Sequence, residues 1–496
     1  MKPDEELPSL RFGVATSDHQ AEAFDARRMD IRDKWEKSQN QTLRGNATDF
    51  WRRYDEDIQL AAELGCGLFR FSISWSRVEP QPGQFDRMAL EHYREVVAAI
   101  RKAGMQPIIT LHHFTWPIHV EERGGQIAPE FPRWFAAYAS EAAAAMGPGV
   151  PYWITFNEPN LLVYGYIKPW WQAGYAMPPG CPVGTGISEQ LDKATQLMRN
   201  LFTAHTLARD EIHKHDPAAK VGTNPFVLGL PGWVLAVQDW IATSTRSRKQ
   251  FQLQQEGIAR PGRVNSALSR LGKGTHPLSK YGLVRKLAPV FGFFDDLLRS
   301  FAVLAAITNT DWWTLGMRGK LSPLFCPESC HGKQDFAGFD YYWGASHIEP
   351  QRVAQLLDAT MSKFANAPVD PPGLLRALRR HHRFFPGLEI LIVENGCIES
   401  ADGFDRAAYI KAHVEKMREA RREGIPVAAY ICWSITSNRE WGLPFSHDSD
   451  FGLYHIDLDT DPLLARRRTK SAEVYAALIG DEAIAHQAAG HKVGAE

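Results

Sequence analysis

Two short stretches of this chain each place a glutamate directly after a run of apolar, strand-forming residues. Trp153–Asn160 reads Trp-Ile-Thr-Phe-Asn-Glu-Pro-Asn, so Glu158 stands beside an amide and before a proline that ends the strand. Glu389–Gly396 repeats the pattern with four branched apolar residues, then Glu394, an amide and a glycine. A carboxyl group at the end of a buried strand is easily desolvated, and its pKa then rises toward neutrality, as a general acid requires.

A single glutamate of this kind is equally well explained as a helix N-cap or as the partner of an arginine. Two of them provide what hydrolysis of a glycosidic bond by a carboxylate pair requires. One group must protonate the leaving oxygen while the other attacks or activates water. The repeated pattern therefore favours Glu158 and Glu394 as a catalytic pair.

Strand-like and helical runs alternate along nearly the whole chain, and this alternation predicts how the two glutamates are positioned. The economical interpretation is an α/β fold, a (β/α)8 TIM barrel. A doubly wound sheet is the alternative, although no GxGxxG follows the first strand. In a barrel, both glutamates lie on the C-terminal face. The eight predicted strands are Phe12–Thr16, Leu68–Ser72, Gln106–Leu111, Tyr152–Phe156, Ala219–Gly222, Asp335–Phe339, Glu389–Val393 and Val427–Trp433.

Other polar and aromatic residues follow the same predicted strand ends. A histidine, tyrosine or tryptophan at one such position is usually structural. Their convergence on one rim suits a polyhydroxylated ring, because its hydroxyls take hydrogen bonds and its C–H faces stack on indole. The residues concerned are Gln20, Arg70, His112, His113, Tyr341, Tyr342, Trp433, Glu440 and Trp441.

Composition and charge argue against several other classes of protein. The chain has 496 residues, 44% hydrophobic and 23% charged, which is ordinary for a globular protein. Its 56 basic and 57 acidic residues give a net charge of −1, so no overall field favours nucleic acid or a membrane. The six cysteines form no CxxC pair, which argues against a zinc site and predicts free thiols. The N-terminus leads into no apolar signal segment, so the expected location is cytoplasmic.

The motifs resemble those of the family 1 glycoside hydrolases, the β-glucosidase and β-galactosidase group, over nearly the whole chain with one interruption. Thr155–Pro159 is similar to the acid/base motif of that family, and Val393–Gly396 is similar to its nucleophile motif. Further similar motifs are the opening segment that ends at Gln20, the second-strand motif Phe69–Arg77, Thr110–His113, and Trp433–Trp441 with Phe451 after it.

The resemblance implies retaining double displacement without a metal or organic cofactor. Glu394 would attack the anomeric carbon, while Glu158 would protonate the departing oxygen and then act as a base on water. Support of this pair would come from Arg70, Asn157 and Tyr342. Sugar binding would come from Gln20, His113, Trp433, Glu440, Trp441 and Phe451.

The chain departs from the family pattern at positions around this predicted site. Asp340 stands where the family usually has asparagine, and it adds a negative charge near the nucleophile. Phe114 and Thr115 replace the usual Trp-Asp pair, while Ser437 and Arg439 replace the usual aspartate and phenylalanine. These changes bear on substrate preference more than on activity. A carboxylate at Glu440 would repel a 6-phosphate, which favours an unphosphorylated sugar.

A long insertion, residues 225–308, interrupts the predicted single catalytic domain between the fifth and sixth strands. It opens with an apolar run that is too short for a membrane span. Residues 242–290 then carry ten lysines or arginines and one acid, and 291–307 are apolar with helical spacing. We expect a mostly helical excursion over the barrel rim that shapes the aglycone site together with Trp170 and Trp171. The alternative is contact with an anionic membrane or a glycolipid.

Three functions remain open at this stage. The first is a retaining β-glycosidase acting on a small-molecule β-glucoside or β-galactoside. The second is a transglycosylase that passes the glycosyl unit to a lipid or sugar hydroxyl. The third is a non-catalytic sugar-binding protein, although both glutamates are present. Nucleic-acid binding has no support beyond the basic part of the insertion.

Overall fold

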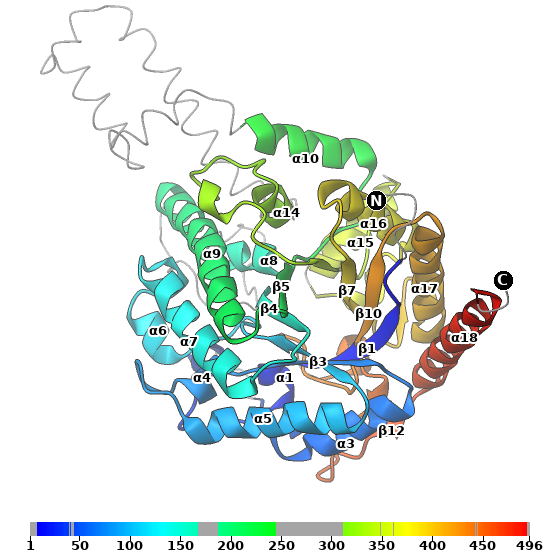
Figure 1. The fold of residues 1–496 in the computed structure, drawn as a ribbon, viewed down its shortest axis with the longest axis horizontal. Coiled ribbons are helices and arrows are strands. Elements are labelled where there is room, and N and C mark those ends of the chain that lie inside the picture. Colours follow the sequence, from blue (N-terminus) through cyan, green and yellow to red (C-terminus); the bar gives the residue numbers. More distant parts are fainter. Residues whose placement is uncertain are drawn as a thin grey trace, which may run out of the picture.

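The computed structural model describes residues 7–166, 187–244 and 311–493, apart from residues 39, 41–43, 348, 361, 442 and 444. Eight strands form one sheet in the order β5-β4-β3-β2-β1-β10-β7-β6, and every neighbouring pair is parallel. Figure 1 shows this sheet curled at the centre of the molecule with helices outside it. The strands are β1 (Arg11–Ala15), β2 (Leu68–Ser72), β3 (Gln106–Thr110), β4 (Tyr152–Asn157), β5 (Lys220–Asn224), β6 (Ala337–Asp340), β7 (Ile390–Asn395) and β10 (Val427–Trp433).

The two end strands of the sheet, β5 and β6, approach each other and nearly close the barrel. The Asp335 N–H donates to the Val221 carbonyl at 2.9 Å, and the Asp340 N–H donates to the Pro225 carbonyl at 3.0 Å. The approach requires glycine, because a Cβ at Gly338 would lie 2.5 Å from the Thr223 carbonyl oxygen. The predicted TIM barrel is therefore confirmed, and the doubly wound alternative is wrong.

Amphipathic helices alternate with the strands and cover the outside of the barrel, as predicted. Residues 353–381 form two separate helices, because a proline pair starts the second one. The larger helices are α3 (Phe50–Glu63), α5 (Arg87–Lys102), α7 (Phe131–Met146), α9 (Ile187–His215), α15 (Pro350–Thr360), α16 (Pro371–Phe384), α17 (Arg406–Arg422) and α18 (Lys470–Val493). Shorter ones include α1 (Asp18–Ala21), α2 (Ile31–Ser38), α4 (Trp75–Val78), α6 (Ile118–Glu122) and α8 (Pro159–Tyr166).

Strand β5 runs two residues beyond its predicted end at Gly222. Thr223 and Asn224 read as a turn before a proline, but Asn224 pairs with Asn157 of β4 and is fully buried. A buried amide is tolerated only where it finds hydrogen-bond partners, and the neighbouring strands supply them. The extension thus carries an unpredicted polar group into the C-terminal face of the barrel.

Two described helices belong to the predicted insertion or follow it, namely α10 (Gly232–Ser244) and α14 (Trp312–Met317). Figure 1 shows both helices outside the strands of the barrel, and α14 contacts α10 and α8. The basic run, the apolar run 291–307, Trp170 and Trp171 all lie outside the described residues. Within the described part of the chain, no helix combines the length and apolarity that crossing a membrane requires.

Candidate active site

Glu394 ends β7 in a position where both of its carboxylate oxygens are satisfied. Arg70, which points inward from β2, donates from Nη1 to Oε1, and the Tyr342 hydroxyl donates to Oε2 at 2.6 Å. Arg70 is itself held by a hydrogen bond from Nε to the Thr110 hydroxyl at 2.9 Å. All of these groups are buried. The two donors fix the orientation of the Glu394 carboxyl group, as a residue that attacks carbon requires.

Glu158 follows β4 in the left-handed backbone region, with φ of 41°. Its side chain is buried, and burial raises its pKa well above the usual range, with the nearby Glu394 charge adding to the effect. A carboxyl group that holds its proton near neutral pH has the property that a general acid requires. One oxygen of Glu158 and one of Glu394 lie within 4.8 Å of each other.

Asn157 is oriented by a hydrogen-bond network that joins residues of four strands, β2, β4, β5 and β6. Its Oδ1 accepts from Arg70 Nη2 at 2.6 Å and from Asn224 Nδ2 at 2.6 Å. Asn224 Nδ2 also donates to Asp340 Oδ2 at 2.5 Å. Two donors occupy the amide oxygen, and the buried Nδ2 of Asn157 has no partner among the described residues. Nδ2 is therefore the group left to donate to a ligand.

The opposite side of the site gathers the groups predicted to bind a sugar. Gln20 Nε2 lies 3.4 Å from Glu440 Oε1 and 3.1 Å from Asn438 Oδ1. Trp433 Nε1 donates to the same Glu440 oxygen at 3.4 Å. Burial raises the pKa of Glu440 to about 8, so the group is mostly protonated at neutral pH in the empty site.

His113 packs beside Trp433 and Trp441, the two indoles that the sequence predicts to bind the sugar. Its ring centroid lies 5.7 Å from that of Trp433 and 6.0 Å from that of Trp441. Its Nδ1 shares a hydrogen bond with the Ser72 hydroxyl at 3.1 Å, and burial lowers its pKa well below the usual value. His113 is therefore a neutral imidazole. His112 instead bonds to Gln126, which gives it a structural role.

Phe451 lies behind Tyr342, with the two ring centroids 5.9 Å apart in an edge-on contact, and it is only 4% exposed. This placement supports the tyrosine that contacts Glu394. Phe451 therefore lies near the other predicted site residues, but its contact with the site is made through Tyr342.

Sequence reasoning missed two groups that hold the site in place. Asn224 was hidden because its strand was predicted to end before it. His19 stacks on Trp441, with centroids 5.6 Å apart, and its Nδ1 lies 2.8 Å from Asp30 Oδ2. Burial lowers the pKa of His19, but the neighbouring acids raise it to about 9. The side chain that stacks on Trp441 is therefore a protonated imidazole. The only sequence signal was proximity to Gln20.

Two carboxylate-rich clusters have the residue types of a metal site, namely Glu158, Asp340 and Glu394, and His19, Asp30 and Asp33. Each cluster already contacts an arginine. Arg70 donates to Glu394, and Arg44 lies 2.9 Å from Asp33. These guanidinium groups supply positive charge where a metal ion would otherwise supply it.

Comparison with known proteins agrees with this geometry. The sequence model of glycosyl hydrolase family 1 matches residues 6–228 and 330–483. Beta-glucosidase A of Thermotoga maritima is 25% identical over 478 residues, which cover 92% of this chain and 94% of that protein. The coniferin beta-glucosidase of Pinus contorta is 26% identical over 453 residues, covering 84% and 79%. A solved beta-glycosidase from Pyrococcus horikoshii superimposes with a TM-score of 0.66 at 25% identity, covering 95% and 94%.

A parallel barrel with two buried glutamates at the ends of β4 and β7 defines the class as a glycoside hydrolase. The matched segments span most of the sequence. The chain belongs to glycosyl hydrolase family 1 and is a β-glycosidase.

Proposed function

We propose that this β-glycosidase is a retaining enzyme that removes the terminal non-reducing β-D-glucosyl or β-D-galactosyl unit from an unphosphorylated glycoside. The observation that carries the proposal is the contrast between Glu394, which accepts hydrogen bonds from Arg70 and Tyr342, and Glu158, whose pKa is raised by burial. One oxygen of each glutamate lies within 4.8 Å of one oxygen of the other. This close approach supports the short carboxyl separation of retaining enzymes, about 5–5.5 Å, over the roughly 6.5–9.5 Å of inverting ones.

In this mechanism, Glu394 attacks the anomeric carbon while the bond to the departing oxygen breaks and takes the proton of Glu158. A glycosyl ester of Glu394 results. Glu158, now a carboxylate, removes a proton from water, whose oxygen attacks the anomeric carbon and releases Glu394. Asn157 donates from Nδ2 to the 2-hydroxyl, a contact that strengthens as positive charge develops on the ring.

The sugar-binding side supports a neutral ring. Gln20, His113, Trp433 and Glu440 bring amide, imidazole, indole and carboxyl groups together without a cation among them. Because the pKa of Glu440 is about 8, its repulsion of a 6-phosphate grows as the pH rises through that value. The preference for a free sugar over its 6-phosphate should therefore widen between neutral and alkaline pH.

Hydrolysis of nitrophenyl β-glycosides tests the proposal. Pure enzyme should hydrolyse the β-glucoside or the β-galactoside, and proton NMR of the first product should show the β-anomer. An α-anomer as first product contradicts retention. Faster turnover of a 6-phospho-glycoside contradicts the substrate class. Predominant transfer of the glycosyl unit to an added alcohol at low concentration points to the transglycosylase alternative, and absence of any turnover contradicts the proposal.

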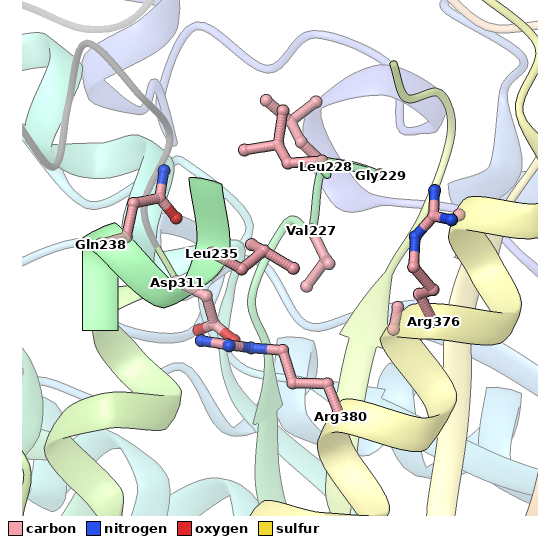
Figure 2. Close-up of a pocket in the computed structure, with 11 residues that line it drawn as sticks. Val227, Leu228, Gly229, Leu235, Gln238, Asp311, Arg376 and Arg380 are labelled. Atoms are coloured by element: carbon pink, nitrogen blue, oxygen red, sulfur yellow. The ribbon is translucent and has the colours of Figure 1, made fainter. Parts of the chain in front are cut away.

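A second proposal concerns helix α10, which belongs to the stretch 229–329 that the family match leaves out and to the insertion that we place within a single catalytic domain. Asp239 on this helix forms a bidentate ion pair with Arg380 of α16, at 2.7 and 2.8 Å. Leu235 and Gln238 line a pocket against the same arginine (Figure 2). One face of α10 is thereby fixed against the barrel.

The opposite face of α10 is apolar and exposed. Trp233, Val237 and Trp240 recur at helical spacing and are 64%, 47% and 70% exposed. This is the reverse of an ordinary surface helix, whose charged residues face water. The sequence that follows carries ten lysines or arginines against one acid over residues 242–290. Exposed tryptophans beside basic residues are suited to an anionic lipid surface.

Vesicle flotation tests this contact. The wild type should float with phosphatidylserine vesicles at low salt, and the double substitution Trp233→Ala/Trp240→Ala should reduce the bound fraction about tenfold. The matched control is Met88→Ala/Leu463→Ala, because both residues are exposed and apolar elsewhere on the surface. Equal binding by the two double variants, or no binding by the wild type, contradicts the proposal.

We also propose a cytoplasmic location. The five cysteines of the described residues are all free and buried, which fits a reducing compartment. Fractionation of cells that produce the native protein would check it, and recovery with the extracytoplasmic fraction contradicts it.

A further inference from the structure

Asp340 forms a third carboxyl group beside the proposed catalytic pair, and the mechanism above gives it no task. It ends β6, and it pairs in the sheet with Glu394 of β7. One oxygen each from Glu158, Asp340 and Glu394 lies within 4.8 Å of the other two. Asp340 is fully buried, so it meets its neighbours without intervening bulk solvent. At that distance in a buried site, the charge on one carboxylate strongly affects the others.

The two oxygens of Asp340 differ in their surroundings. Oδ2 accepts from Asn224 Nδ2 at 2.5 Å, and the same Nδ2 donates to Asn157. Oδ1 is buried and has no hydrogen-bond partner within the part of the chain that the structure describes. An ionised carboxylate with an orphan oxygen carries a large desolvation cost. The Oδ2 atom of Asp340 accepts a hydrogen bond, and the oxygen of an asparagine side chain could accept the same bond. The Oδ1 atom acts on its neighbours through its charge.

The charged groups that act on Asp340 come from three other strands, and the fourth neighbour, Asn224 of β5, is a neutral donor. Glu158 follows β4, Glu394 ends β7, and Arg70 on β2 is the nearby cation among the described residues. Tyr342 and Arg70 both contact Glu394, so their positive ends are directed at the nucleophile. Glu440 adds a further acid on the sugar-binding side. Burial and like charge raise the pKa of Glu158 and of Asp340, and the Arg70 charge and the Asn224 hydrogen bond to Asp340 offset only part of that rise.

We propose that Asp340 is a positioning residue that holds the proton on Glu158 and so extends the activity of this enzyme to higher pH. The inference rests on the proposed role of Glu158 as the general acid. The hydrogen bond from Asn224 lowers the pKa of Asp340, and the Glu158 side chain accepts no such bond among the described residues, so Asp340 is the first of the two to lose its proton. Ionisation of Glu158 would then place a second carboxylate charge in the same buried space. Glu158 therefore keeps its proton, and it remains able to protonate the leaving group.

The test is the pH dependence of kcat/KM in Asp340→Asn, which keeps an acceptor for Asn224 and removes only the charge. With a glycoside whose leaving group needs protonation, the alkaline limb should move down by about one pH unit or more. Asp340→Ala should move it in the same direction. A dinitrophenyl glycoside, whose leaving group needs little protonation, should show a much weaker alkaline limb in all three proteins. An unchanged or raised midpoint in Asp340→Asn overturns the inference, and so does a uniform loss of rate at every pH.

A measurement without turnover separates this inference from the proposed function. Infrared difference spectroscopy follows the carboxylic acid band that disappears in Glu158→Gln. That band should titrate at lower pH in Asp340→Asn than in the wild type, and an identical midpoint overturns the inference. Failure of the wild type to hydrolyse any glycoside would refute the proposed function, and the infrared titration would still decide the role of Asp340.

Discussion

The two halves of the active site give the same residue type opposite properties. On the β7 side, Glu394 receives donors on both oxygens from Arg70 and Tyr342. On the β4 side, Glu158 is buried beside Asp340, and its pKa is raised. Both glutamates come at the end of an apolar strand, and each is next to an asparagine in the sequence. The difference therefore comes from donors and acids on neighbouring strands, and it is the basis on which we propose Glu394 as the nucleophile and Glu158 as the acid.

The largest expected effect comes from removing the nucleophile from the donor-rich half. Glu394→Gln keeps the shape of the side chain but loses the charge, and kcat should fall by about 10⁴-fold or more. The matched control is Glu389→Gln at the other end of the same chain segment, where the carboxylate binds Tyr152 and Lys220. The control should keep kcat within a few-fold. Comparable losses in the two variants would contradict the assignment of Glu394.

Removing Glu158, the proposed acid on the side with fewer donors, should lower kcat less than removing Glu394 does. Glu158→Ala should lower kcat by about 10²–10⁴-fold for a leaving group that needs protonation, and much less for dinitrophenolate. Azide should restore turnover and yield a β-glycosyl azide, because the vacated space admits an anion that attacks the glycosyl-enzyme. Product analysis by NMR checks this. An α-azide, or no restoration by azide, would argue against the division of roles.

A smaller effect is expected from one donor on the nucleophile side. Tyr342→Phe removes the hydroxyl that donates to Glu394 and should lower kcat about tenfold to a hundredfold. Tyr341→Phe is the control, because its hydroxyl donates at 2.6 Å to the Asp370 carbonyl, away from the pair. That variant should lose thermal stability while its kcat stays near that of the wild type. Equal kcat values for the two variants would contradict a role of the Tyr342 hydroxyl in catalysis.

The smallest effect concerns stability on the acid-rich side. The raised pKa of Asp340 means that the folded state binds this proton more tightly than the unfolded chain. The associated stability is fully present below the ordinary carboxyl pKa of about 4 and is lost as the pH rises through the raised pKa. Asp340→Asn removes that loss, so its melting temperature should exceed that of the wild type by about 2 °C near pH 8. The difference should vanish near pH 4, and a constant difference would indicate a packing effect.

Much of the barrel and the placement of Glu158 and Glu394 at strand ends were predictable, because the relevant signals are local. Strand β2 has its predicted bounds, and both glutamates follow their apolar runs as expected. Asn224 was not predictable, because a Thr-Asn-Pro sequence resembles a turn and its partners come from β4 and β6. The stack of His19 on Trp441 joins residues more than four hundred positions apart, so no local pattern could reveal it.

The amino-acid sequence by itself determined the alternation of strands and helices, the placement of Glu158 and Glu394 at strand ends, and the family motifs. These depend on hydrophobic periodicity and short motifs, which act over a few residues. Only the tertiary structure decided which glutamate receives donors, where the Asp340 charge lies, and which face of α10 meets the barrel. Those properties depend on distances between strands and helices that are remote in the chain, and both pKa shifts and burial arise from such distances.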